Sequence, residues 1–312
     1  MTSIGSAERG YQRPKRRRRV QLAVPGSNIR MMEKAALSAA DHVFLDLEDA
    51  VAPSEKVAAR EKVAKALLDH DWQGKTRCVR INDLGTRWAY RDVIDVLEKA
   101  GSHLDTIMLP KARDAADIQF LDTLLTQLEL DLELDRRIGI EVLIEEVEGL
   151  MHVERIATAS PRVESLIFGM GDYTASHGLD PLAIEGRSAY PADVWHYGRW
   201  RIIMAARAAG IDAIDGPFSG FRESELYTLE AQRAQLLGMV GKWAIHPNQI
   251  PWALDVFTPA PQAVEAARRL VAAYEDAKRQ GLGAIVIDGQ MVDAGGVRLA
   301  RVLIDRADAL GL

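Results

Sequence analysis

The sequence predicts a closed (β/α)8 barrel, the TIM barrel fold, with a short C-terminal helical lid extension, and three observations indicate it. Short apolar runs alternate with long amphipathic stretches along most of the chain. The alternation repeats about eight times, which is typical of a parallel sheet built from strand–helix units. The repeats occupy roughly 235 residues, close to the about 250 residues of a typical TIM barrel.

The candidate strands are rich in Val, Ile and Leu and too short for helices, as expected of buried parallel strands. They are Val20–Val24, His42–Leu47, Arg77–Ile81, Thr106–Leu109, Gly139–Ile144, Ser165–Phe168, Ala213–Ile214 and Lys242–Ile245. An open doubly wound sheet is the alternative. It should carry a glycine-rich phosphate turn after the first strand, and Pro25-Gly26-Ser27 is not such a turn.

Helical patterns fill the intervals between the strands. They cover Met31–Ala40, Glu55–Leu68, Tyr90–Ala100, Ala115–Leu130, Glu148–Ala159, Trp195–Ala209 and Glu223–Leu237. Ser27 or Asn28 precedes the first helix, and Ser54 precedes the second, as N-cap residues do. Gly101, Gly210 and Gly238 follow three of the helices, where a left-handed residue commonly ends a helix.

A tail follows the eighth strand and is too short for an independent domain. Pro261–Gln280 predicts a helix, Ala284–Asp293 is a short apolar segment that ends in acids, and Val297–Ala309 predicts a final helix. We therefore expect a barrel over residues 20–255 and a lid segment over residues 256–312 that packs on the barrel or on a neighbouring subunit.

The composition excludes several classes of protein. The chain has 312 residues and a net charge of −6, which gives no footprint for nucleic acid as a main partner. Cys78 is the single cysteine, so no internal disulfide forms, as in a reducing cytoplasm. No apolar run reaches the about 18 residues of a membrane span. We expect a cytoplasmic protein without a membrane or nucleic-acid partner.

The first 19 residues are polar and end in the basic run Lys15–Arg19. No apolar segment of a secretory signal follows this run. RNA, an acidic partner surface or the phosphates of a ligand would each attract it. We interpret residues 1–19 as a flexible, solvated basic arm.

Catalytic groups of a TIM barrel lie just past the carboxyl ends of its strands. In strand order these positions hold Pro25-Gly26-Ser27, Asp46-Leu47-Glu48-Asp49, Arg80-Ile81-Asn82, Pro110-Lys111, Glu145-Glu146, Gly169-Met170-Gly171-Asp172, Asp215-Gly216-Pro217 and His246-Pro247. Acids from strands two, five, six and seven should therefore meet at one end of the barrel, together with Arg80 and Lys111.

Carboxylates that meet in a cleft repel one another and take up protons unless a cation compensates them. Oxygen ligands, with no Cys and little His, suit Mg²⁺ better than zinc. Glu145 and Asp172 are the best pair of ligands because they follow adjacent strands. Taken singly, each acid is more often structural than catalytic, and Arg80 can serve only to neutralise one of them. The joint pattern is what favours a site.

The sequence resembles the HpcH/HpaI aldolase superfamily, the citrate lyase β-subunit-like family of CoA-ester lyases. Within it, the chain looks most like malyl-CoA/β-methylmalyl-CoA lyases. The segments that carry the resemblance run in order from residue 20 to the C-terminal tail. They are Leu22–Ser27, Val43–Val51, Val79–Asn82, Leu109–Lys111, Glu141–Glu145, Phe168–Tyr173, Ile214–Phe218, Gly241–Pro247 and Asp288–Asp293.

The resemblance implies roles for single residues. Glu145 and Asp172 match the family's ligands for Mg²⁺, which Mn²⁺ could replace, and Arg80 matches an arginine that contacts the reacting carbonyl oxygens. Asp293 matches a carboxylate that a neighbouring subunit supplies in trimeric or hexameric members of the family. The segment that binds CoA corresponds to Ser27, Arg30 and Lys34. Glu48 and Asp49 complete the candidate catalytic set, and Glu48 or Asp288 is the alternative base.

The implied activity is a reversible, Claisen-type cleavage of a 3-hydroxyacyl-CoA such as malyl-CoA or β-methylmalyl-CoA, which gives glyoxylate plus acetyl-CoA or propionyl-CoA. A citramalyl-CoA or citryl thioester lyase and a malyl-CoA thioesterase are alternatives. Others are an aldolase of free hydroxy-keto acids and a non-catalytic CoA- or RNA-binding subunit. Thr174–Val194 is shorter than the corresponding loop of the malyl-CoA lyases, which leaves the substrate open.

Overall fold

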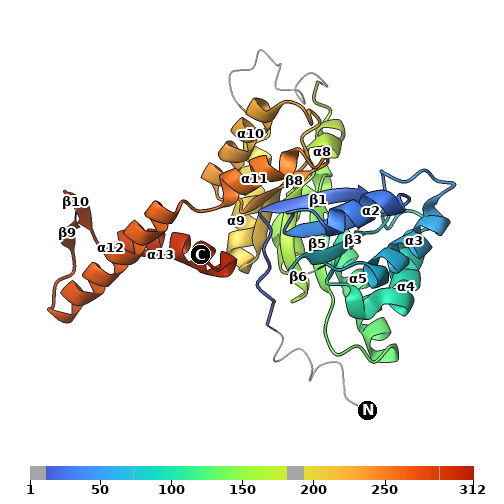
Figure 1. Cartoon of the computed structure of the whole chain (residues 1–312), viewed down its shortest axis with the longest axis horizontal. Coiled ribbons are helices and arrows are strands. Elements are labelled where there is room, and N and C mark those ends of the chain that lie inside the picture. The colour runs from blue at the N-terminus through green and yellow to red at the C-terminus, as the bar shows by residue number, and fades with distance from the viewer. Residues whose placement is uncertain (1–11, 73, 181–192, 288) are drawn as a thin grey trace.

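Eight parallel strands close into a barrel in sequence order in the computed structural model, which describes residues 12–72, 74–180, 193–287 and 289–312 (Figure 1). The strands are β1 (Val20–Pro25), β2 (His42–Asp46), β3 (Thr76–Arg80), β4 (Thr106–Leu109), β5 (Gly139–Ile144), β6 (Val163–Phe168), β7 (Asp212–Asp215) and β8 (Gly241–Ala244). Pairing of Gln21 in β1 with Trp243 in β8 closes the ring. The prediction of a TIM barrel is confirmed, and each predicted strand end differs from the observed one by two residues or fewer.

Helices surround this ring. They are α2 (Ile29–Ala36), α3 (Lys56–Asp69), α4 (Ala89–Ala100), α5 (Ala115–Asp131), α6 (Val147–Met151), α7 (Val153–Ala157), α8 (Met170–His177), α9 (His196–Ala209), α10 (Ser224–Leu237) and α11 (Gln249–Phe257). The predicted helix Glu148–Ala159 is divided at His152, and α8 and α11 were not predicted.

The three glycines that were expected to end helices behave differently. Gly210 is left-handed with a φ of 67°, as predicted, and Gly238 also has a positive φ, of 121°, but lies outside the αL region. Gly101 has a φ of −56° and starts the short 3-10 helix η2 (Gly101–His103), so the prediction of a left-handed residue there is wrong. Its lack of a side chain serves packing instead, because a Cβ atom would lie 3.1 Å from the side chain of Leu134.

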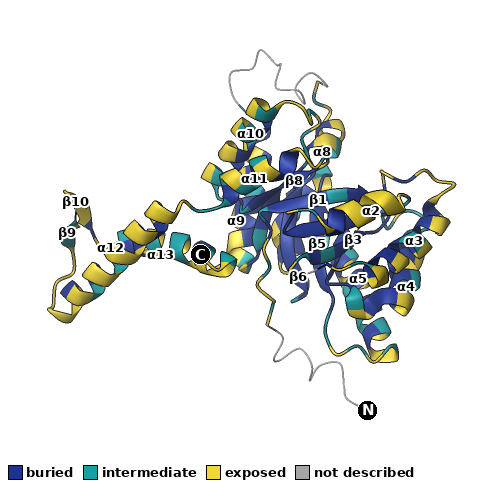
Figure 2. Cartoon of the chain, viewed as in Figure 1, coloured by how far each residue is buried: buried dark blue, intermediate teal, exposed yellow. Residues whose placement is uncertain are grey.

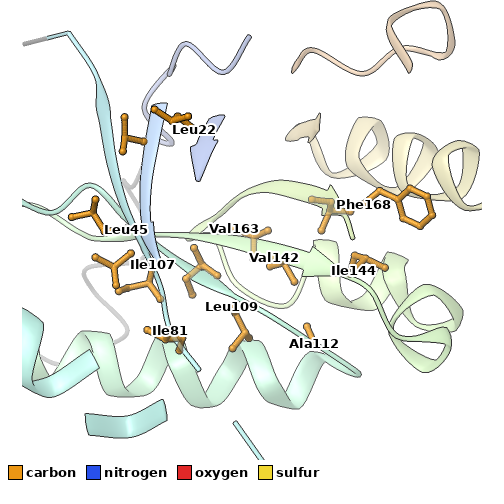
Figure 3. Packing of buried hydrophobic residues seen from close by; sticks show 14 of the residues in the cluster. Leu22, Leu45, Ile81, Ile107, Leu109, Ala112, Val142, Ile144, Val163 and Phe168 are labelled. Atoms are coloured by element: carbon orange, nitrogen blue, oxygen red, sulfur yellow. The ribbon is translucent and has the colours of Figure 1, made fainter. Parts of the chain in front are cut away.

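Strand residues alternate between two apolar regions, as the pleat requires. Outward residues such as Val142 and Ile144 pack against the helices in one large cluster, part of which Figure 3 shows. Inward residues fill the middle of the barrel, namely Phe44, Cys78, Met108, Leu143, Ile167, Ile214 and Trp243. Cys78 is therefore a packing residue, and its burial raises the pKa of the thiol.

Polar side chains form the floor of the barrel, at the amino ends of the strands. Glu141 accepts hydrogen bonds from Gln21 (2.9 Å) and Thr106 (3.2 Å), and its carboxylate lies 3.0 Å from Nε2 of His42. Arg18 also pairs with Glu141, at 3.4 Å. Burial alone would raise the pKa of Glu141, but His42 and Arg18 lower it below its usual range. At the floor, the buried carboxylate of Glu141 is therefore compensated by the side chains around it.

The basic arm differs from the sequence expectation. Arg18 is 3% exposed and reaches Glu164 at 2.5 Å and Asp212 at 3.1 Å. Arg16 bonds Glu164 at 2.7 Å and Arg19 bonds Asp41 at 2.7 Å. The expectation of a flexible, solvated arm is therefore wrong for this part of the chain, because its arginines satisfy acids at the barrel floor. Residues 1–11 lie outside the described residues.

The C-terminal segment projects from the barrel as an arm (Figure 1). It consists of α12 (Pro261–Arg279), the antiparallel strands β9 (Ile285–Ile287) and β10 (Gln290–Val292), and α13 (Ala294–Leu310). Its small apolar cluster centres on Tyr274, Val292 and Val297, separate from the barrel core. Much of its surface is exposed (Figure 2), and the β9–β10 hairpin lies at the end far from the barrel. Phe257 still packs in the barrel cluster, slightly beyond the predicted boundary at residue 255.

Candidate active site

A cavity of about 420 Å³ opens at the carboxyl ends of the strands. Phe44 and Trp243, from the middle layer of the barrel, line its inner end with ring centroids 4.4 Å apart. Four of the predicted site residues line the cavity: Asp49, Arg80, Glu145 and Asp172. The site therefore has an apolar bottom and an ionic wall.

Arg80 is held rigidly inside this cavity. Asp46 accepts two hydrogen bonds from the guanidinium, at 2.8 and 2.7 Å, and Glu48 lies 3.0 Å away. Asp46 also accepts hydrogen bonds from the backbone N–H groups of Glu48 and Ala50. Burial alone would raise the pKa of Asp46, but Arg80 lowers it below its usual range. Asp46 thus positions Arg80 and shapes the turn after β2.

Lys111 lies among three carboxylates. Its Nζ atom is 2.5 Å from Glu48, 3.5 Å from Asp49 and 3.2 Å from Asp172. Its backbone has a φ of 51°, in the left-handed region that non-glycine residues rarely adopt. Burial alone would lower the pKa of Lys111, but Glu48 raises it, so the side chain is an ammonium ion. A single positive charge therefore gathers acids from strands two and six.

Glu145 is the least compensated acid of the group. It is buried, and one oxygen accepts a hydrogen bond of 3.0 Å from the backbone N–H of Lys111. Burial, followed by repulsion from Glu48, raises the pKa of Glu145 well above its usual range. Gly169 permits this placement, because a Cβ atom there would lie 2.5 Å from Cβ of Glu145.

These residues fit a divalent cation. The donor set is oxygen-rich, as Mg²⁺ requires, and it comes from rigid strand ends. Glu145 lacks a full counter-charge, and the cluster already attracts an ammonium ion to Asp172. A cation between Glu145 and Asp172 would relieve the repulsion that raises the pKa of Glu145.

Comparisons with known proteins agree with this geometry. Residues 19–247 match the family described as HpcH/HpaI aldolase/citrate lyase. The chain belongs to this family. An L-malyl-CoA/β-methylmalyl-CoA lyase of Cereibacter sphaeroides is 43% identical over 95% of this chain and 96% of its own length. A (3S)-malyl-CoA thioesterase of the same species is 34% identical over 93% of this chain and 94% of its own length.

Solved structures share the fold. A citrate lyase of Burkholderia xenovorans has a TM-score of 0.84 at 23% identity, with 94% of this chain and 92% of that chain covered. The protein CitE of Mycobacterium tuberculosis, in complex with magnesium, acetoacetate and coenzyme A, has a TM-score of 0.72 at 32% identity. The match covers 93% of this chain and 97% of that chain.

Not every predicted acid reaches the site. Asp215, at the end of β7, is fully buried among helices and pairs with Arg199 at 2.9 Å and Lys242 at 2.6 Å. The expectation that strand seven adds an acid to the cavity is wrong, because residue 215 follows the inward residue Ile214 and points to the opposite face.

Asp293 does not reach the cavity of its own chain. It caps α13 by accepting hydrogen bonds from the backbone N–H groups of Gly295 (2.9 Å) and Gly296 (3.0 Å). These two bonds lower the pKa of Asp293. Asp293 follows β10 at the end of the arm that is far from the barrel (Figure 1). The alternative base Asp288 lies outside the described residues.

The three candidate CoA residues follow β1 at the same end of the barrel as the cavity. Arg30 and Lys34 are exposed, one helical turn apart on α2, and the carbonyl of Ser27 accepts a hydrogen bond of 3.1 Å from Lys62. Their role stays a prediction. Of the short loop Thr174–Val194, residues 181–192 lie outside the described residues. No helix in the described parts of the chain is long and apolar enough to cross a membrane.

The sequence predicted Lys111 beside the acids at this end of the barrel, but not that its side chain would contact three of them. The residue was noted at the end of strand four, within the family-like segment Leu109–Lys111, but no role followed from that position. A lysine side chain is long and flexible, so its strand position does not show which carboxylates it meets.

Proposed function

We propose that this protein is a Mg²⁺-dependent CoA-ester lyase. It cleaves and forms the bond between C2 and C3 of a 3-hydroxyacyl-CoA such as malyl-CoA or β-methylmalyl-CoA, with glyoxylate and acetyl-CoA or propionyl-CoA as the other side of the reaction. The observation that carries the proposal is the buried Arg80 beside Glu145 and Asp172 in one cavity. The 43% identity to a lyase of this specificity over nearly the whole chain supports it.

The metal-binding residues are Glu145 and Asp172. Magnesium, when bound, supplies a Lewis acid and a template for the oxygens of the keto acid, and Mn²⁺ has the same preference for oxygen ligands. The charge of Arg80, fixed by Asp46, stabilises the negative oxygen of the acyl-CoA enolate. The apolar rings of Phe44 and Trp243 limit the water that could protonate this enolate early.

Proton transfer at the α-carbon of the acyl-CoA is assigned to Asp293 of a neighbouring subunit. The carboxylate is ionised and exposed at the end of an arm, far from the cavity of its own chain. Met291 and Val286 beside it are 78% and 72% exposed, and such apolar surface is suited to burial against another chain. We therefore propose a homo-oligomer, a trimer or hexamer, in which the arm is the lid. Glu48 is the alternative base.

CoA is assigned to the outer surface of α2. Arg30 and Lys34 would face the phosphates of the nucleotide part, and Ser27 lies on the loop that joins β1 to α2. We place the activity in the cytoplasm, where CoA thioesters are used and the lone thiol of Cys78 stays reduced.

A cleavage assay tests this function. Purified protein with Mg²⁺ receives malyl-CoA, β-methylmalyl-CoA and citramalyl-CoA separately, while keto acid is trapped as its phenylhydrazone and free CoA thiol is followed in parallel. Keto acid without free thiol is the expected result for the first two substrates. Free thiol without keto acid would identify a thioesterase, the activity named for the relative at 34% identity. No turnover of any substrate would favour a non-catalytic CoA- or RNA-binding subunit.

Complementation tests the shared site. Glu145→Gln removes a ligand from the barrel and Asp293→Asn removes the base from the arm, so each pure variant should be inactive. Co-expression should restore part of the activity, because a mixed oligomer contains sites with an intact barrel and an intact arm. The two variants carry different affinity tags, so that purification through both tags isolates mixed oligomers. Mixed oligomers without activity would contradict a base supplied by the neighbour.

A further inference from the structure

The basic run Lys15–Arg19 has two sides, and only one of them has a structural explanation. Burial alternates along residues 15–18, just before β1, so these side chains divide between two sides. Arg16 and Arg18 point inward and pair with acids of the barrel floor. Lys15 and Arg17 point outward and are exposed. Within the described parts of the chain, neither forms an ion pair.

Lys15 and Arg17 line a cavity of about 830 Å³ at the amino ends of the strands, opposite to the candidate active site. Its walls come from the basic arm, the loop between α3 and β3, η2 and the last turn of α13. The lining includes five Lys or Arg side chains and two histidines against two aspartates: Lys15, Arg16, Arg17, Lys75, Arg77, His70, His103, Asp71 and Asp105. This positive cavity belongs to a chain whose net charge is −6.

One of the two aspartates in the wall of this cavity is already saturated with positive charge, and the other, Asp71, interacts electrostatically with Lys75. Asp105 lies 2.8 Å from Arg77, 2.9 Å from Arg136 and 3.4 Å from Arg16. It therefore has no capacity left to neutralise Lys15 or Arg17 at the rim. Burial lowers the pKa of Lys75, in the same wall. The cavity therefore contains more positive than negative side chains, and the ion pairs among the described residues do not account for Lys15 and Arg17.

We propose that this cavity binds a small anion that carries an oligophosphate group. Arginine and lysine are the side chains that bind phosphate oxygens most strongly, and the dimensions are those of a small-molecule site. The cavity is open to solvent, and the negative net charge of the chain, −6, favours a small anion over a long polyanion such as RNA. The site is distinct from the cavity at the carboxyl ends of the strands.

Isothermal titration of the full-length protein with inorganic tripolyphosphate tests the site. EDTA in the buffer prevents divalent ions from bridging the probe to Glu145 and Asp172. We expect one tripolyphosphate per chain, and the double variant Lys15→Ser, Arg17→Ser should bind it about tenfold more weakly or worse. Both side chains are exposed, so the urea unfolding curve of this variant should match that of the wild type.

Two control variants test whether the loss of affinity for tripolyphosphate is specific to Lys15 and Arg17. Arg233→Ser combined with Lys278→Ser removes the same charges from exposed positions on α10 and α12, and should leave the affinity unchanged. Arg30→Ser combined with Lys34→Ser removes the proposed CoA contacts, and should also leave it unchanged. Equal weakening in all three variants, or no binding by the wild type, would overturn the proposal. A salt-sensitive complex with single-stranded RNA that is tighter than that with tripolyphosphate would overturn the assignment to a small anion.

Discussion

Two glutamates of the same strand segment have opposite environments. Glu141 in β5 and Glu145 directly after it both point into the barrel, four residues apart. Glu141 meets Arg18, His42 and hydrogen-bond donors at the floor, and its pKa is lowered. Glu145 is also buried but lies among other acids, and its pKa is raised. One end of the barrel is electrostatically satisfied, and the other is not.

This difference distinguishes Glu141, which supports the fold, from Glu145, which serves function. A buried carboxylate with matched partners is costly to remove, because its partners would be left buried and uncompensated, and it has no capacity left for a ligand. A buried carboxylate without matched partners costs stability and binds a cation that relieves the cost. The floor therefore serves as the rigid base, and the opposite end carries the reactive groups. Substitutions of the two glutamates should have effects of different kinds.

The largest expected effect is on catalysis. Glu145→Gln should lower Mg²⁺-dependent turnover by about a thousandfold or more, because the neutral amide is a poor ligand for the ion. The folded protein should be at least as stable as the wild type in EDTA, since the unfavourable charge is gone. Steady-state kinetics over a Mg²⁺ titration measures the first effect and urea unfolding the second. Turnover near the wild-type rate would remove Glu145 from the site.

The next largest effect is on stability. Glu141→Gln should lower the free energy of unfolding by about 1–3 kcal/mol, because the buried Arg18 keeps only Glu164 and Asp212 and the bonds that Gln21 and Thr106 donate to the carboxylate are lost. Mg²⁺ binding by the remaining folded protein should be close to normal. Equilibrium unfolding in urea, with Glu145→Gln as the matched control on the same strand, measures the difference. A loss below about 1 kcal/mol would mean that the floor does not depend on this charge.

The dependence of stability on pH should have opposite signs for the two residues. Glu141 has a lowered pKa, so its contribution is fully present above pH 4.5 and is lost as the pH falls below that value. Glu145 has a raised pKa, so its folded form holds a proton above pH 4.5, and the protein loses stability as the pH rises toward that raised pKa.

Urea midpoints measured in EDTA across this range should separate the two contributions. Glu145→Gln should flatten the loss of stability above pH 4.5, and Glu141→Gln should flatten the loss below it. Mg²⁺ should also reduce the loss above pH 4.5 in the wild type, because the ion replaces the proton. If the urea midpoints of the two variants depended on pH in the same way, this would contradict the conclusion that Glu141 is compensated at the floor and Glu145 is not compensated at the opposite end.

The smallest expected effect sharpens the comparison at the reactive end. Lys111→Met removes the ammonium ion that lies 3.2 Å from Asp172. Mg²⁺ should bind about fivefold to tenfold more tightly, because one competing positive charge is gone, and the EDTA-treated protein should melt at a lower temperature. Isothermal titration with Mg²⁺ measures this, with the exposed Arg113→Met as control. Weaker Mg²⁺ binding by this variant would instead mean that Lys111 holds the metal ligands in position.

The sequence predicted the barrel because strand composition and spacing are local properties. It also predicted which residues follow the strands, so Arg80, Glu145 and Asp172 were expected in one cleft. The direction of each side chain depends on the pleat, and a shift of one residue reverses it. For this reason Asp215 was wrongly expected in the cavity. The pairing of Arg18 with Glu141, Glu164 and Asp212 joins distant parts of the chain, and no local pattern indicates it.

That pairing has a consequence for the order in which the chain is made. Arg18 leaves the ribosome early, but its three acids follow 123, 146 and 194 residues later. At typical rates of translation, the last of them is added about 10–40 s after the arginine. During that interval the nascent chain cannot complete the floor, and its apolar strands lack their final neighbours. The part of the barrel that is most thoroughly paired in the finished molecule is therefore among the last to form, and the growing chain depends until then on protection from aggregation.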